Sequence, residues 1–123
     1  MNPTHSDVLN EGQSASLERR FSSEDIYDWN QLCQLDGGWQ GVPEPLIAGL
    51  FSCLLGKDLP GNGTIYLEQD MTFHNTANAD ENLRATVTVS RLRRNRTLVN
   101  LITQCTGRDN RLICDGEALV LFR

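Results

Sequence analysis

Four closely spaced arginines are the clearest group of side chains that could bind a charged ligand. A guanidinium donates paired hydrogen bonds whose geometry matches the oxygens of a phosphate, so such a group can hold a phosphorylated ligand. A solvent-exposed hairpin turn also explains the group, and we favour that interpretation. The four residues are Arg91, Arg93, Arg94 and Arg96.

Cysteine and histidine offer little chemistry in this chain. The four cysteines show no CxxC spacing and the only histidines are His5 and His74, so we expect no metal site and no bound cofactor. Cys53 falls inside a predicted helix, and we interpret the cysteines as core residues rather than nucleophiles. His74 falls on a predicted strand, where a surface or interface position is a simpler interpretation than a catalytic base. Reduced thiols are typical of a cytoplasmic protein, and we expect that location.

Length and charge limit the classes of function. A chain of 123 residues forms one domain with a single core. Its net charge of −5 argues against general nucleic-acid binding, which needs a clustered positive field. No stretch approaches the roughly 18 apolar residues of a membrane helix, and no secretory leader pattern opens the chain. We therefore expect neither nucleic-acid nor membrane partners.

A helix predicted within residues 42–56 is the element around which the chain is organised. Pro43 and Pro45 suit its entrance, where their missing N–H groups would have no partner. Its broad apolar face consists of Leu46, Ile47, Leu50, Phe51, Leu54 and Leu55. Its opposite face carries only the small residues Ala48, Gly49, Ser52, Cys53 and Gly56. Such a face lets a partner subunit or a thin acyl chain approach closely.

The remaining pattern predicts an α+β fold. Residues 1–13 are predicted to be a flexible tail, residues 14–21 a first strand, and residues 22–33 a short helix with one face formed by Ile26, Trp29, Leu32 and Cys33. After the central helix the hydrophobic period changes from 3.6 to 2. Strands are predicted at residues 64–73, 85–90, 97–106 and 112–122. One long apolar helix followed by several antiparallel strands predicts a sheet wrapped around that helix.

Several runs resemble the MaoC-like family, specifically its (R)-specific enoyl-CoA hydratases. The run Leu-Pro-Gly-Asn-Gly-Thr-Ile-Tyr-Leu at residues 59–67 is the most specific match, supported by residues 50–56, 71–73 and 115–120. The resemblance covers most of the chain with one gap. It implies that residues 14–123 form a single hotdog domain, an antiparallel sheet wrapped around one long central helix.

The gap falls where the family carries its chemistry. These hydratases use an Asp, and a His within Asn-Pro-x-His, as the acid/base pair that adds water to a trans-2-enoyl thioester. Here Leu35 stands at the Asp position, and residues 36–41 replace the Asn-Pro-x-His block and most of the overhanging segment that follows it. No histidine lies between His5 and His74. The resemblance therefore implies a chain that has lost the standard hydratase reaction.

Other residues match positions of the family's site. Ser52 matches its active-site serine, although a small residue packed against a neighbouring helix is an equal alternative. Glu44 stands where the family has a glycine whose N–H binds the thioester carbonyl, and its N–H could still donate there. Asp36 is the best substitute for the missing acid/base pair, but a turn aspartate beside Gly37 is the favoured interpretation.

Further residues could line or cover an acyl site. Trp39 could replace the missing overhang as a lid or plug, or be an exposed interface residue. Gly49, on the small face of the central helix, is a further substrate-binding candidate. Arg93, Arg94 and Arg96 are the candidates for contacts with CoA phosphates.

Four functions remain open from the sequence. The first is a protein that handles acyl-CoA or acyl-carrier protein without standard hydration. The second is a hydratase or dehydratase with a rearranged acid/base pair, and the third is a thioesterase that uses Glu44 or Asp36. The fourth is a structural or interaction subunit. We expect a homodimer, because one small sheet wrapped on a helix leaves an open edge, and a heteromer with an active partner is the alternative.

Overall fold

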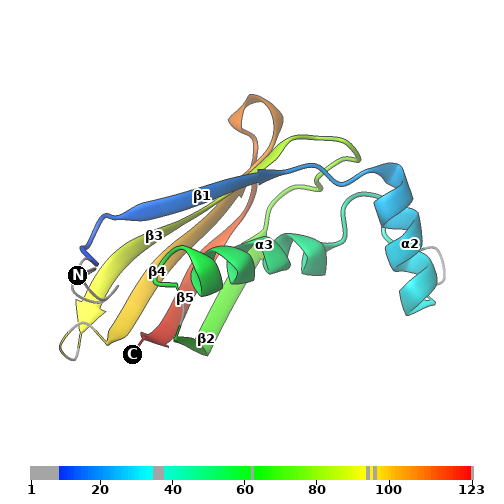
Figure 1. The fold of residues 1–123 in the computed structure, drawn as a ribbon. Coiled ribbons are helices and arrows are strands. Elements are labelled where there is room, and N and C mark those ends of the chain that lie inside the picture. Colours follow the sequence, from blue (N-terminus) through cyan, green and yellow to red (C-terminus); the bar gives the residue numbers. More distant parts are fainter. Residues whose placement is uncertain (1–8, 35–37, 62, 94, 96, 123) are drawn as a thin grey trace.

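The structure is a computed structural model that describes residues 9–34, 38–61, 63–93, 95 and 97–122 (Figure 1). In chain order the elements are β1 (Ser14–Arg19), α2 (Ser23–Cys33), α3 (Glu44–Lys57), β2 (Thr64–Phe73), β3 (Leu83–Arg93), β4 (Leu98–Thr106), the 3-10 turn η1 (Arg108–Asn110) and β5 (Leu112–Phe122).

The strands form one antiparallel sheet in the order β1-β3-β4-β5-β2. The sheet curves around α3, which lies along one of its faces, while α2 lies beyond one end of the sheet (Figure 1). β1 and β2 form the two edges, each with a single neighbouring strand. The predicted α+β architecture, an antiparallel sheet wrapped around one long helix, is confirmed.

The core is formed by the apolar face of α3 and the inward side chains of the strands. In α3 the buried residues are Ile47, Leu50, Phe51, Leu54 and Leu55, and the predicted Leu46 is only partly buried beside them. In β3 burial alternates along the strand, with Leu83, Ala85, Val87 and Val89 buried. The helical period and the strand alternation therefore predicted the core from local sequence.

The predicted helix α2 begins with the expected cap, but only the first part of its apolar face is buried. Ser22 caps the helix: its hydroxyl accepts from the Asp25 N–H, and the Asp25 carboxylate accepts from the Ser22 N–H. Ile26 is buried, but Leu32 is 79% exposed. Cys33 and Cys53 are also exposed, so the interpretation of the cysteines as core residues is wrong for these two and correct for the buried Cys105 and Cys114. The later turns of α2 extend beyond the sheet (Figure 1), so the apolar face has no core to pack against there.

The segment before β1 lies against the sheet. Leu9 is buried, and the Gly12 N–H donates to the Val89 carbonyl over 2.7 Å. These residues fall within the span predicted as a tail, and they add to the core beside β3. In the described part of the chain, the helices are too short or too polar to cross a membrane.

Candidate functional site

A pocket of about 370 Å³ lies between the start of α3 and the inner side of β2. Trp39, in the turn before α3, forms part of its wall. The other lining residues are Glu44, Pro45, Ala48, Gln69, Met71 and Phe73. Most of these side chains are apolar, so the pocket suits an apolar ligand with few polar groups.

Two periodicities bring these residues together. Glu44 and Ala48 are one helical turn apart on the same face of α3. Gln69, Met71 and Phe73 alternate along β2, and Met71 and Phe73 also pack against the core. The pocket is therefore built on a helix and a strand, which hold its shape.

The start of α3 provides the polar end of the pocket. Glu44 is the first residue of the helix, and its side chain is partly exposed at the pocket wall. A helix N-terminus favours negative charge, including the partial charge on a carbonyl oxygen. An apolar pocket that ends at this point can hold an acyl chain and orient the carbonyl attached to it.

A second pocket, of about 380 Å³, surrounds the buried carboxylate of Glu81. The carboxylate accepts from the N–H groups of Asn78 and Arg108 and from Arg111 Nη2, which lies 2.7 and 2.9 Å from its two oxygens. These bonds join the segment between β2 and β3 to the turn between β4 and β5. The arrangement stabilises two loops, and we give it a structural role.

Known proteins identify the family. A scan against family models gives no match. The (R)-specific enoyl-CoA hydratase of Aeromonas caviae is 33% identical to this chain over 127 residues, which span 91% of this chain and 94% of the relative. The chain belongs to the (R)-specific enoyl-CoA hydratase family. The enzyme of the same name from Rhodospirillum rubrum is 34% identical over 128 residues, 92% of this chain and 88% of the relative.

The solved structures agree with this assignment. The (R)-hydratase of A. caviae involved in PHA biosynthesis has a TM-score of 0.83 at 29% identity, covering 94% of this chain and 98% of that structure. The resemblance to MaoC-like hydratases and the hotdog fold are thus confirmed.

Two predicted substrate-binding residues, Ser52 and Gly49, do not line the pocket. Ser52, two turns after Glu44 in α3, is exposed and accepts a hydrogen bond from the Tyr66 hydroxyl over 3.3 Å. Partial burial raises the pKa of Tyr66 above its ordinary range, and the bond to Ser52 opposes this shift. Gly49 is also exposed, and a methyl group there would meet nothing within 4 Å. Of the predicted acyl-site residues, the structure brings Trp39 and Glu44 together in the pocket.

The predicted phosphate contacts lie elsewhere. Arg93 ends β3 and donates to the Asn100 side chain over 2.9 Å. The end of β3 and the start of α3 lie at opposite ends of the molecule (Figure 1). Arg94, Arg96 and Asp36 lie outside the described residues.

Several pocket residues were not predicted as site residues. Gln69, Met71 and Phe73 could have been found from their alternation along the strand that follows the central helix, whereas Pro45 and Ala48 could have been found from their helical spacing to Glu44.

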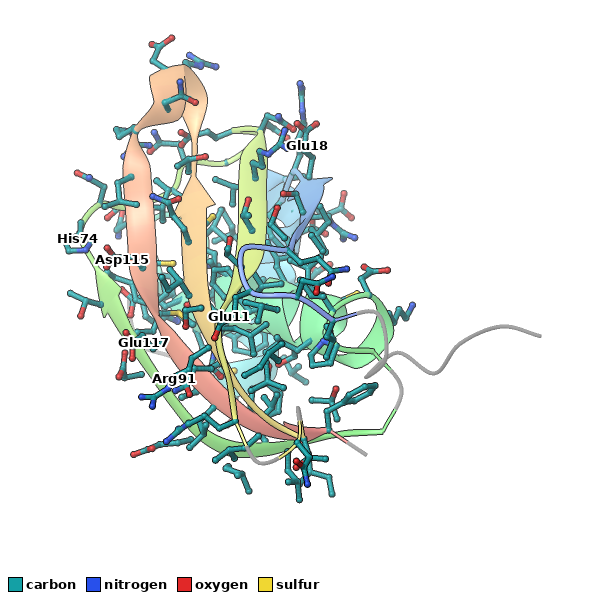
Figure 2. All side chains as sticks on the ribbon, turned by 90° about the vertical axis from the view of Figure 1, so that its left-hand side faces the viewer. Glu11, Glu18, His74, Arg91, Asp115 and Glu117 are labelled. Carbon is teal, nitrogen blue, oxygen red and sulfur yellow. The ribbon has the colours of Figure 1, made fainter. Side chains whose placement is uncertain are left out.

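His74 follows the pocket residue Phe73 but does not line the pocket. It follows β2, is partly exposed, and its Nε2 lies 2.8 Å from Asp115 Oδ1. Figure 2 shows this pair at the β2 side of the sheet, beside Glu117. The location agrees with the surface interpretation of His74.

Proposed function

We propose that this chain binds acyl thioesters on a hydratase scaffold and lacks the standard hydratase reaction. The observation that carries the proposal is the apolar pocket at the N-terminus of α3, which joins a place for an acyl chain to a helix end suited to its carbonyl. The sequence at the family's acid/base positions has Leu35 and no nearby histidine. A general acid or base typically contributes about 10²–10⁴-fold, so a site without either hydrates very slowly.

The first test mixes the purified protein with crotonyl-CoA and follows loss of the enoyl-thioester absorbance. We expect turnover at background. In parallel, butyryl-CoA should raise the thermal midpoint, since a ligand at 100 times its Kd stabilises by about 2.7 kcal/mol. Butyryl-pantetheine tests binding of the thioester portion that CoA and acyl-carrier protein share. Free CoA is the control for binding through the nucleotide.

A variant links this binding to the pocket. Ala48→Phe should fill the pocket and abolish the shift, while Ala79→Phe adds the same side chain at an exposed loop position and should preserve it. Turnover above background would contradict the proposal and indicate a rebuilt acid/base pair. Release of CoA thiol would favour a thioesterase that uses Glu44, which lies in the pocket wall. If no thioester raises the thermal midpoint, a structural or interaction subunit is the remaining function.

We also propose that two copies join through the edges of β2. This edge strand exposes Ile65, Tyr66 and Leu67, at 42%, 40% and 52%. Sedimentation should give twice the 13.8 kDa chain mass. Leu67→Lys should shift the mass toward the monomer, and Leu32→Lys, on exposed α2, should not. A monomeric wild-type protein would contradict the homodimer, and assembly with an active hydratase chain would then support the heteromer.

The cytoplasmic location remains a proposal. The four cysteines are free thiols in the structure, which supports a reducing compartment.

A further inference from the structure

Trp39 is held at its backbone by a single side chain from α2. Asn30 Oδ1 accepts from the Trp39 N–H over 3.0 Å, and Asn30 Nδ2 donates to the Trp39 carbonyl over 3.2 Å. One amide therefore satisfies both backbone polar groups of Trp39. Because the N–H needs an acceptor and the carbonyl needs a donor, this pairing also fixes which way the amide faces.

The neighbouring glycine makes this contact possible. Gly38 has a φ of +54°, in the left-handed region that glycine adopts without strain. A Cβ at Gly38 would lie 2.5 Å from Asn30 Cγ. Any other residue would push the amide away, so the backbone before Trp39 is shaped to receive Asn30.

The chain after Trp39 is held as well. The Val42 N–H donates to the Ala77 carbonyl over 2.8 Å, and a Cβ at Gly41 would clash with the same carbonyl. The turn before α3 is thus held by Asn30 at Trp39 and by Ala77 at Val42. Trp39 lies in the pocket wall with Pro45 and Phe73.

We propose that Asn30 is a positioning residue that holds Trp39 in the wall of the pocket, and that this wall limits the length of the acyl chain in a bound thioester. The inference rests on the proposed function and names its substrate class. A tryptophan side chain has only two torsions, so once its backbone is held, only those two remain to place the indole. Trp39 forms part of the pocket wall, so a longer acyl chain would need the space that Trp39 occupies.

The test measures Kd by titration calorimetry for butyryl-CoA and decanoyl-CoA. The wild type should prefer butyryl-CoA. Trp39→Ala should change the ratio of the two Kd values by about tenfold or more toward decanoyl-CoA, the scale expected when a pocket gains room for extra methylenes. Asn30→Ala should shift the ratio in the same direction by less. Gln31→Ala changes the exposed residue that follows Asn30 in α2, and it should leave the ratio of the two Kd values unchanged.

A second measurement needs no ligand. In a Trp29→Phe background, acrylamide should quench Trp39 fluorescence more strongly after Asn30→Ala than after Gln31→Ala. Trp29 Nε1 is buried without a hydrogen-bond partner in the described structure, so phenylalanine there loses no bond.

The outcomes separate the two proposals. If acyl-CoA binds but the Kd ratio is the same in all variants, the length limit is overturned and the proposed function stands. If quenching is also unchanged by Asn30→Ala, the positioning role is overturned. If no acyl-CoA binds, the proposed function is contradicted and the length limit with it, whatever the result of the quenching experiment.

Discussion

Phe51→Ala should lower the free energy of unfolding by about 3–5 kcal/mol, the range for removing a buried aromatic side chain. Phe51 is fully buried in the middle of α3, at the centre of the curved sheet. Alanine would leave a cavity between helix and strands that the packed core cannot fully close. Natural domains are stable by about 5–15 kcal/mol, so much of the folding free energy would be lost.

Urea denaturation followed by circular dichroism measures this effect. The matched control is Leu32→Ala, because Leu32 is 79% exposed on α2 and its loss should change stability by less than about 0.5 kcal/mol. Equal effects of the two substitutions would contradict the position of α3 as the core of the fold.

Glu81→Gln should destabilise the protein by about 2–4 kcal/mol, although it changes only one atom of the side chain. All the groups that reach the carboxylate are donors: the N–H groups of Asn78 and Arg108 and the guanidinium of Arg111. A glutamine amide would turn its own NH₂ toward one of these donors, so a bond would be replaced by a clash of like groups. The loops before β3 and after β4 should loosen together.

The pH dependence identifies the charge as the cause. Burial alone would raise the pKa of Glu81, but the bonds from Asn78, Arg108 and Arg111 outweigh it and hold the pKa below its ordinary value of 4.5. A lowered folded-state pKa adds stability that is fully present above the unfolded-state pKa and is lost as pH falls through the folded-state pKa. The difference in unfolding free energy between wild type and Glu81→Gln should therefore shrink as the medium is acidified below that ordinary value.

The control for this prediction is an exposed ion pair. Glu18 and Arg84 lie 3.8 Å apart with more than half of each side chain exposed, so Glu18→Gln should change stability little. A constant difference between wild type and Glu81→Gln down to strongly acidic pH would show that the Glu81 carboxylate is not held in its charged form.

Local patterns predicted the fold because they depend on neighbours in sequence. The apolar face of α3 and the alternation of β3 repeat at the helix and strand periods, and a capping pair such as Ser22 and Asp25 is three residues apart. The same reasoning placed Leu32 on an apolar face of α2, yet Leu32 is exposed, because periodicity reports which face is apolar but not whether another element covers it.

The candidate site was less predictable. Glu44 and Trp39 followed from the family resemblance, and the pocket does contain both. The bonds from Asn30 to the Trp39 backbone leave no pattern in the sequence, because the partner groups belong to the main chain that every residue shares. Only the three-dimensional arrangement of α2 and the following turn reveals them.

The open edge of β2 has a consequence for which features of this chain natural selection conserves. An uncovered strand with Ile65 and Leu67 at its surface invites pairing with other chains, which leads to aggregation. The proposed loss of the hydratase reaction would not remove that hazard. Under the proposed function, natural selection against insoluble protein would maintain a covered β2 edge after selection for the reaction had ended, so the fold would be conserved longer than the catalysis.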